Sequence, residues 1–548
     1  MTGIYRRKTG FWLLISCLIS QGVRAQTVCA DRLVYAPVSQ PNRIEWAKFP
    51  AFTLPFTIVF NGPRLGDTQA QPLRHGFSHI VSLADGEFGT FVQPRQRAVD
   101  WAGFAYGLNQ PWETLQSPWN NDKAAYRAKW TQFLSDIAGK QTDSQGKFLL
   151  NTDIMSVDIE RFLDTDTRIL RLKQDPATPA QYRNLTDAAF LLRYKNDMVA
   201  LYAEGMRFIR DRANTTSTRL LTYSDTPIRN QYLNIPANAW TDWTTNRNRV
   251  NYMTRDTTTG NVGGPFYDQL DALGPSAYYF YNYPNPLASD YLGYLLFQIE
   301  ANRAWSPKPV IPYVWMRFHE STVPGNPFIQ PFMAEATAIF PFFSGASGLW
   351  LWDNIGLPNT RQETYTAYES FIHGLYRLSR FSAMFEGDHE LVIETPARDL
   401  VDKQLPVWRG VYKNNKLLVA AQNPYAKTDQ QITTLTVGYK SWRTTITLTG
   451  RETYLCQFDI PVITGLNDPT AAGLSVFPNP AQTGLTVTFP PLATPNSLLT
   501  ISDITGRIRL QQSVNPVGKQ EIDVAGLPAG MYLLRLSDGR TTRFLKVQ

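Results

Sequence analysis

Strand-like and helix-like segments alternate from about residue 51 to residue 382, and this alternation constrains the fold more than any other feature. The apolar, strand-like runs are 52–60, 77–83, 154–159, 220–223, 273–280, 310–316 and 349–352, and helical periodicity marks 186–212, 289–305, 329–343 and 364–381. Alternating strands and helices predict an α/β fold with a parallel sheet, and a stretch of this length fits a (β/α)8 TIM barrel. The missing third strand is expected within 100–147, a region rich in Trp and Asn that should also carry long loops.

From about residue 383, short strands and turns replace this alternation. Asn414-Asn415 separates two of the strand-like runs and is typical of a hairpin turn. We therefore expect a small antiparallel β-domain at 383–463 and a linker at 464–472. In 473–548, apolar and polar residues alternate with period two between Pro, Gly and Asn turns, which predicts a small β-sandwich.

Four motifs follow one another in this last segment. They are Phe-Pro-Asn-Pro at 477–480, Asp-Ile-Thr-Gly-Arg at 503–507, Leu-Pro-Ala-Gly-Met-Tyr at 527–532 and Lys-Val-Gln at 546–548. In this order they resemble the type IX secretion C-terminal sorting domain of the Bacteroidetes. The resemblance implies recognition by the type IX machinery, passage across the outer membrane and removal of the domain. An ordinary terminal β-domain is the alternative.

The N-terminus has the features of a secretory signal peptide. A basic run, Arg6-Arg7-Lys8, precedes an apolar stretch at 11–19, and small residues frame a cut after Ala25. We expect a signal peptide at 1–25 and an N-terminal segment at 26–50; a lipoprotein box ending at Cys17 is the alternative. No later window reaches the ~18 apolar residues of a membrane helix. The sequence thus predicts a secreted or cell-surface protein without a transmembrane segment.

Charge and aromatic content narrow the class of partner. Removing the four basic residues of the expected signal peptide leaves 49 Lys and Arg against 46 Asp and Glu, a net charge of +3. This balance, without a basic cluster, argues against nucleic acid as a partner. Aromatic residues make up 13% of the chain. In an exported protein they favour a cleft for carbohydrate, because sugar rings stack on aromatic planes.

Two cysteines, Cys29 and Cys456, remain after loss of the signal peptide. They could form one disulfide between the N-terminus and the β-domain, or stay as two buried thiols. Spacing alone does not decide between these states.

Two carboxylates, Asp158 and Glu160, stand at the end of the strand-like run 154–159. Side chains alternate along a strand, so we expect both to point into the barrel mouth while Val157 and Ile159 point outward. When two carboxylates lie this close, ionisation of both is disfavoured, so one of them should have a raised pKa. A carboxyl group that keeps its proton can donate it to a glycosidic oxygen. The plainer interpretation is an acidic strand end that caps a helix or binds an arginine.

Aromatic residues gather at three other strand ends and are the expected substrate contacts. Tyr279 and Tyr281 end the run at 273–280, Tyr313 lies in the run at 310–316, and Trp352 ends the run at 349–352. Each aromatic residue alone is better explained by core packing than by a binding site. Their shared position after barrel strands is what favours a sugar-binding site.

Four of these strand ends resemble, in order, the hyaluronidase family of barrel glycosidases within about 55–382. The matching segments are Val-Asp-Ile-Glu-Arg-Phe at 157–162, the tyrosines around Tyr281, Tyr313, and Gly-Ala-Ser-Gly-Leu-Trp-Leu-Trp at 345–352 with Asn-Thr-Arg at 359–361. The resemblance implies a substrate-assisted mechanism. Glu160 would protonate the leaving oxygen, and Asp158 would orient the substrate's own 2-acetamido group as its carbonyl attacks C1. Tyr281, Tyr313 and Trp352 would line the subsite.

The chain also departs from that family. The family's cysteine framework is missing, Asp353-Asn354 replaces small residues, and 100–147 has no counterpart. These departures leave the identity of the sugar open. A hydrolase that uses its own nucleophile is an alternative, with Asp225 or Asp353 as candidates.

The sequence gives little support to zinc, serine-nucleophile, phosphate-binding or dinucleotide chemistry. His75 and His79 are four residues apart, but on a strand-like segment, so they do not make a His-Glu-x-x-His zinc motif. The sequence has no Gly-x-Ser-x-Gly elbow, phosphate loop or dinucleotide fingerprint, and no cofactor or metal is expected. The favoured function is a secreted glycoside hydrolase acting on a polysaccharide or glycan. The alternative is a non-catalytic carbohydrate-binding surface protein on a degenerate barrel.

Overall fold

The computed structural model of the chain forms two compact units, Met1–Ile460 and Pro461–Gln548. It describes residues 27–30, 32–34, 36, 40–63, 65, 70–81, 93–101, 118–119, 122–158, 165–229, 232, 234–354, 363–460, 474–489, 497–515, 518–537 and 540–548. The expected signal peptide, the linker at 464–472, Glu160 and the segment 359–361 lie outside these residues. The two units are described separately.

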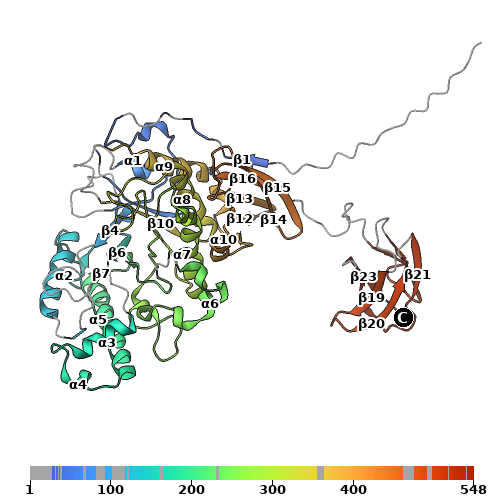
Figure 1. Cartoon of the computed structure of the whole chain (residues 1–548), viewed down its shortest axis with the longest axis horizontal. Helices are drawn as coiled ribbons and strands as arrows, with labels where there is room; N and C mark the ends of the chain where they lie inside the picture. Colours follow the sequence, from blue (N-terminus) through green and yellow to red (C-terminus); the bar gives the residue numbers. More distant parts are fainter. Residues whose placement is uncertain are drawn as a thin grey trace, which may run out of the picture. The chain divides into compact units, whose positions relative to one another are not determined.

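The first unit contains a parallel barrel, which confirms the expected fold class (Figure 1). Seven strands form one sheet in the order β8-β6-β4-β3-β2-β10-β9. Their bounds are β2 (Thr57–Asn61), β3 (His79–Val81), β4 (Arg97–Trp101), β6 (Ile154–Asp158), β8 (Arg219–Tyr223), β9 (Tyr313–Trp315) and β10 (Gly348–Trp352). The strand expected within 100–147 is β4, which begins just before that range.

The segment 273–279 makes isolated parallel bridges to β8 and to the segment of β9, and so closes the ring as an eighth, irregular strand. Gly274 bridges to Tyr223, and Ser276 bridges to Tyr313, both in parallel. The glycine is required here, because a Cβ at position 274 would lie 2.7 Å from the carbonyl oxygen of Thr222. Any larger residue would push this strand off β8 and open the barrel.

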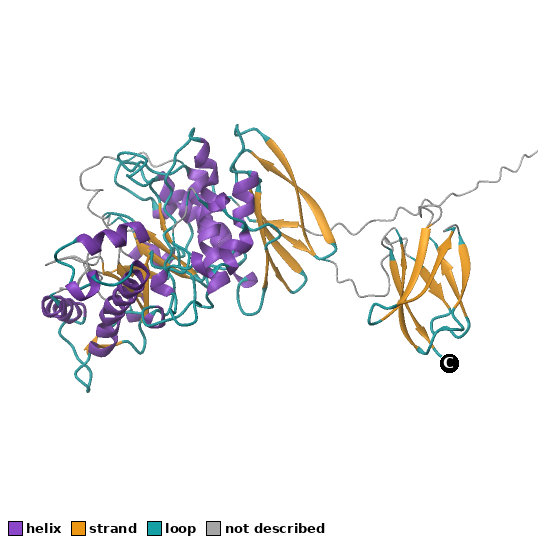
Figure 2. Cartoon of the chain, turned by 60° about the horizontal axis from the view of Figure 1, so that its bottom comes forward, coloured by secondary structure: helices purple, strands orange, loops and turns teal. Residues whose placement is uncertain are grey.

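Helices pack around the strands (Figure 2). They are α1 (Gln71–Arg74), α2 (Lys123–Ile137), α3 (Asp166–Arg171), α4 (Ala180–Arg183), α5 (Asp187–Arg212), α6 (Trp240–Thr245), α7 (Tyr291–Trp305), α8 (Pro331–Phe343), α9 (Thr366–Ser379) and α10 (Ala397–Lys403). The four segments of helical periodicity correspond to α5, α7, α8 and α9. Within the described residues, no helix is both long and apolar enough to cross a membrane.

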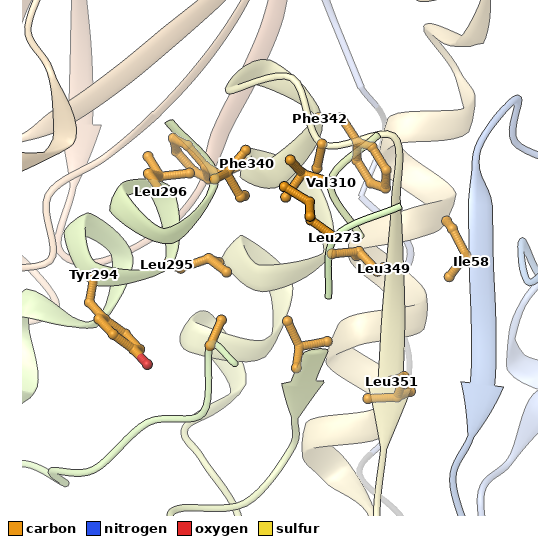
Figure 3. Packing of buried hydrophobic residues seen from close by; sticks show 14 of the residues in the cluster. Ile58, Leu273, Tyr294, Leu295, Leu296, Val310, Phe340, Phe342, Leu349 and Leu351 are labelled. Atoms are coloured by element: carbon orange, nitrogen blue, oxygen red, sulfur yellow. The ribbon is translucent and has the colours of Figure 1, made fainter. Parts of the chain in front are cut away.

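Because side chains alternate between the two faces of each strand, the strands contribute to two separate hydrophobic cores. Val59, Ile154, Leu221 and Trp350 belong to a cluster inside the barrel. Their neighbours along the strands pack outward against the helices; Figure 3 shows Ile58, Leu273, Val310, Leu349 and Leu351 in this second cluster, near Phe340 and Phe342 of α8. A polar residue at an inward position near a strand end is therefore directed into the barrel mouth.

A β-domain follows the barrel within the same unit. Its main sheet has the order β1-β16-β13-β12-β11, and β14 and β15 form a hairpin beside it. The bounds are β1 (Thr27–Cys29), β11 (Glu390–Val392), β12 (Val407–Lys413), β13 (Lys416–Gln422), β14 (Ile432–Tyr439), β15 (Trp442–Thr449) and β16 (Tyr454–Asp459). Asn414 and Asn415 both have positive φ and form the turn between β12 and β13, as the sequence predicts.

The first described residues also belong to this domain. Strand β1 pairs antiparallel with β16, with Cys29 opposite Cys456 and their Cα atoms 4.0 Å apart. The two cysteines form a disulfide, which answers the question that spacing left open. The β-domain is joined to the barrel by a buried ion pair, 2.7 Å between Arg409 in β12 and Glu300 in α7.

The second unit is an antiparallel β-sandwich with its own core. One sheet consists of β17 (Ser475–Phe477), β18 (Gly484–Thr488) and β21 (Lys519–Asp523); the other, in the order β20-β19-β22-β23, of β19 (Ser497–Asp503), β20 (Ile508–Val514), β22 (Gly530–Leu536) and β23 (Thr541–Lys546). Leu485, Val487, Ile501, Leu534 and Phe544 are fully or almost fully buried between them. The period-two pattern of 473–548 correctly predicts these strands.

Candidate active site

Asp158, the last residue of β6, lies at the carboxyl end of the barrel. Val157 is buried in the outer cluster and Ile154 in the inner one, so Asp158 lies at an inward position, two residues beyond Ser156. The carboxylate is partly exposed. This is the orientation expected from the sequence. Glu160, two residues later, lies outside the described residues.

A second carboxylate, Asp100 of β4, faces the same space. Asp100 is 7% exposed and pairs in register with Ser156 of β6. The Asn61 side chain at the end of β2 donates a hydrogen bond from Nδ2 to Oδ2 of Asp100 over 2.8 Å. The sequence reasoning missed both residues. Asp100 could have been predicted from its position two residues after the inward-facing Ala98, in a strand that begins earlier than expected.

Tyr278 lies close to these carboxylates and packs on an aromatic wall at the mouth, which consists of Tyr223, Trp315 and Trp352. Burial raises the pKa of Tyr278 well above its ordinary value, and Tyr223, Tyr313, Asp100 and Asp158 raise it further by their negative charge. The phenol therefore stays protonated and can donate a hydrogen bond to a substrate oxygen. Its ring packs against Tyr223 with centroids 5.7 Å apart and against Trp352 at 5.8 Å.

Tyr279, predicted as a substrate contact, points the other way. It is 1% exposed, belongs to the outer cluster, and its hydroxyl shares a 2.6 Å hydrogen bond with Oγ1 of Thr337 in α8. The period of two along the strand gives the inward position to Tyr278 instead. The structure thus places Tyr279 in the outer cluster and Tyr278 in the inner one.

Tyr313 and Trp352 both face the barrel interior, at different depths. Tyr313 is 2% exposed, donates a hydrogen bond to Oγ of Ser156 and stacks on Trp350 at 5.1 Å, so it forms the floor of the site. Trp352 is partly exposed at the mouth, 4.9 Å from the ring of Trp315. Trp352 is thus placed to stack on a sugar, and Tyr313 to support Asp158 from below.

Tyr281 lies beyond the end of the closing strand. Its ring is partly buried and packs against Tyr232 with centroids 5.2 Å apart. The structure does not bring it into contact with the Tyr278 and Trp352 pair. A role in substrate binding would require a ligand that extends over this loop.

Asp353 is buried beneath the aromatic wall. It is 2% exposed and accepts hydrogen bonds from Trp315 Nε1 at 2.7 Å and Tyr368 at 2.8 Å, while Arg317 Nε lies 3.3 Å away. Burial raises the pKa of Asp353 although Arg317 opposes the shift. Because its oxygens are occupied within the protein, Asp353 is placed to hold Trp315 and not to attack a substrate.

Asp225, the other candidate nucleophile, is also enclosed. It is 0% exposed, accepts a 2.9 Å hydrogen bond from Nδ2 of Asn251, and lies 3.8 Å from Nε of Arg229. The structure therefore brings together Asp158, Tyr313 and Trp352 of the predicted residues, and encloses Tyr279, Asp225 and Asp353 among partners within the protein. Among the described residues, no cluster of His, Cys, Asp or Glu is arranged to hold a metal ion.

The fold and this mouth define the first unit as a (β/α)8 barrel with a carboxylate and aromatic site at its carboxyl end. In the second unit, residues 475–547 match the family model of the secretion system C-terminal sorting domain. The sorting domain expected from the four motifs is confirmed. It directs the protein to the outside of the cell or to the cell surface. No curated protein matches the chain.

Several solved structures are similar in fold. Bee venom hyaluronidase is 13% identical, with a TM-score of 0.39 over 59% of this chain and 99% of the hyaluronidase. An Anoxybacillus α-amylase is 12% identical, with a TM-score of 0.36 over 77% and 100% of the two chains. A glycoside hydrolase family 30 xylanase of Clostridium acetobutylicum is 12% identical, with a TM-score of 0.30 over 77% and 98%. At these values the similarities carry no argument about reaction or substrate.

Proposed function

We propose that the protein is a secreted glycoside hydrolase that cleaves a polysaccharide or glycan by carboxylate acid/base catalysis. The observation that supports this most is the barrel mouth, where Asp158 and Asp100 face Tyr278 and the partly exposed ring of Trp352. Carboxylates beside aromatic planes suit a sugar whose ring stacks while its glycosidic bond reacts.

Glu160 is the proposed acid. The period of two along a strand is the basis for expecting its side chain on the same side as Asp158. Glu160 would protonate the glycosidic oxygen as the bond from C1 breaks. Asp158 would hold the 2-acetamido group of the substrate while its carbonyl oxygen bonds to C1. Glu160 would then take a proton from a water whose oxygen bonds to C1 as the bond from C1 to the carbonyl oxygen breaks, which restores both the acid and the 2-acetamido group.

The burial of Asp225 and Asp353 supports this assignment over a protein nucleophile. Both carboxylates are at most 2% exposed and engaged by neighbouring side chains. An attack on C1 would require either residue to leave those partners. We therefore place the nucleophile on the substrate.

The test is the Glu160→Gln variant on a panel of glycans, with product analysis. The matched control is Asp166→Asn, which changes an exposed carboxylate at the start of α3. We expect products from the wild type and the control, and a loss of ~100-fold or more in the variant. Undiminished turnover in the variant would end the assignment. Binding without products from any glycan, indifferent to the substitution, would favour the carbohydrate-binding alternative.

Export completes the proposal. We infer that the signal peptide at 1–25 takes the chain to the periplasm, and that the type IX machinery recognises the sorting domain. Deleting 473–548 in the native host should leave the barrel inside the cell envelope, as fractionation would show. Normal export of the truncated chain would contradict this route.

A further inference from the structure

A hollow of about 410 Å³ lies outside the barrel interior, between the N-terminal segment and the connection that follows β2. Its polar lining includes Gln40, Asn42, Arg43, Glu45 and Gln71. Ile44, Trp46 and Leu65 add apolar surface, with Ile44 and Trp46 almost fully buried. None of the residues that line it belongs to the site at the barrel mouth.

The N-terminal part of this hollow is held firmly in place. The backbone nitrogen of Asn42 donates to the carbonyl oxygen of Glu363 over 2.7 Å, and that of Glu45 donates to Oε1 of Glu369 over 3.1 Å. Asn42 has φ of 55°, a left-handed conformation that asparagine tolerates better than most residues. Trp46 anchors the segment by packing against His75 at 5.3 Å. These contacts therefore hold the backbone that carries the lining residues 42–46 in a fixed position.

The position of the hollow links it to the barrel mouth. Leu65 follows Asn61 by four residues, so their Cα atoms are at most about 14 Å apart. Asn61 is the residue that bonds to Asp100. On the other side, Glu363 precedes α9 in the connection from β10 and pairs with Arg317 at 2.8 Å. Of the residues that line the hollow, Leu65 thus follows β2, and Asn42 is bonded to Glu363, which lies between β10 and α9. The carboxyl ends of β2 and β10 are at the same end of the barrel as Asp158.

The charge and polarity of the side chains that line the hollow determine which kind of ligand fits it. Arg43 is already paired, with its Nε 3.1 Å from Oε1 of Glu45 and its Nη1 donating to Oε1 of Gln40 over 3.2 Å. The charges cancel, and the carboxamides of Asn42 and Gln71 offer both donors and acceptors. Such a lining suits hydroxyl and amide groups and offers no net charge to a carboxylate or sulfate. The partly exposed Leu65 offers apolar surface to the face of a sugar ring, whereas Ile44 and Trp46 are almost fully buried and support the hollow from within.

We propose that this hollow is an accessory binding site for an uncharged oligosaccharide, which holds a distal part of the polymer whose reacting sugar lies over Asp158. The inference rests on the proposed function for the identity of the polymer, but binding in the hollow needs no catalysis. It predicts that long, uncharged glycans bind more tightly than short ones, because only long chains span both sites.

The test is calorimetric titration of the full chain with three probes: the hexasaccharides of N-acetylglucosamine, of xylose and of hyaluronan. We compare the wild type with the double variant Arg43→Ala/Gln71→Ala and with Arg74→Ala. Arg74 is an exposed residue of the same helix as Gln71 and does not line the hollow, so it is the matched control. An unchanged midpoint of urea unfolding shows that each variant is folded.

We expect the best uncharged hexasaccharide to lose about tenfold in affinity in the double variant and nothing in Arg74→Ala. Its disaccharide should bind all three proteins equally. Equal affinity of the wild type and the double variant overturns the inference, as does tightest binding of the hyaluronan probe or no binding of any probe. Hydrolysis that ignores both substitutions at every chain length refutes the accessory site alone. Selective binding without products refutes the proposed reaction alone.

Discussion

Asn61 and Asp100 join the carboxyl ends of two barrel strands, β2 and β4, across the short β3 that separates them. The bond is 2.8 Å from Nδ2 to Oδ2 and lies where both side chains are at most 8% exposed. It fixes the orientation of a carboxylate whose charge is felt by both Tyr278 and Tyr313. An uncharged residue, Asn61, therefore orients the carboxylate that adds to the raised pKa of both tyrosines.

Replacing Asn61 by Ala should damage both stability and turnover. The change leaves the largely buried carboxylate of Asp100 without this donor, which typically costs about 1–3 kcal/mol of unfolding free energy. Turnover should fall because Asp100 is freed to rotate within the site. Urea unfolding and initial rates on the best glycan measure the two effects. Wild-type values for both would show that the bond is unimportant.

Tyr278→Phe and Tyr279→Phe form a matched pair on adjacent residues. Tyr278 faces the carboxylates, so loss of its hydroxyl should lower turnover by roughly tenfold or more with little change in stability. Tyr279 bonds to Thr337 in α8, so loss of its hydroxyl should cost about 1 kcal/mol of stability and leave turnover intact. The reverse pattern would mean that the faces of the strand are assigned wrongly.

Asp353→Asn should behave as the loss of a positioning residue. The change removes the charge that compensates buried Arg317, and we expect a loss of about 3 kcal/mol, near the low end for a broken buried pair because Glu363 still contacts the guanidinium. Asparagine keeps only one acceptor oxygen, so it cannot accept from Trp315 and Tyr368 through separate oxygens as Asp353 does. Trp315 is then held less firmly, and KM should rise more than kcat falls. Complete loss of turnover in a fully stable variant would return Asp353 to the list of nucleophiles.

Acid should weaken the barrel at its amino end through Asp153. Burial opposes ionisation of Asp153, but hydrogen bonds from His79 at 2.9 Å and Arg219 at 2.6 Å outweigh it and lower its pKa. A lowered pKa in the folded state gives stability that is present above the ordinary value of about 3.9 and is lost as the pH falls through the folded value. Asp153→Asn should therefore be less stable than the wild type at pH 6, with a flatter decline below pH 4. Parallel curves of unfolding free energy against pH would contradict this.

Local patterns predicted much of the architecture because they depend on neighbours in the chain. The period of two marks the strands of the second unit, and the period of helices marks α5, α7, α8 and α9. The orientation of Asp158 follows from the same alternation. Which of Tyr278 and Tyr279 faces inward could not be predicted, because local periodicity does not fix the register of that strand. Its register is set by the approach of Gly274 to β8.

The amino-acid sequence by itself determined the barrel, the sorting domain and the strand end that carries Asp158, since each is written in local periodicity or a contiguous motif. Only the tertiary structure decided which polar residues share a site. It brought Asn61 and Asp100 together from separate strands, paired Cys29 with Cys456 across a separation of 427 residues, and enclosed Asp353 against Arg317. The physical reason is that these contacts depend on the closure of the ring. Closure places residues far apart in the chain within bonding distance, and spacing along the chain does not encode those distances.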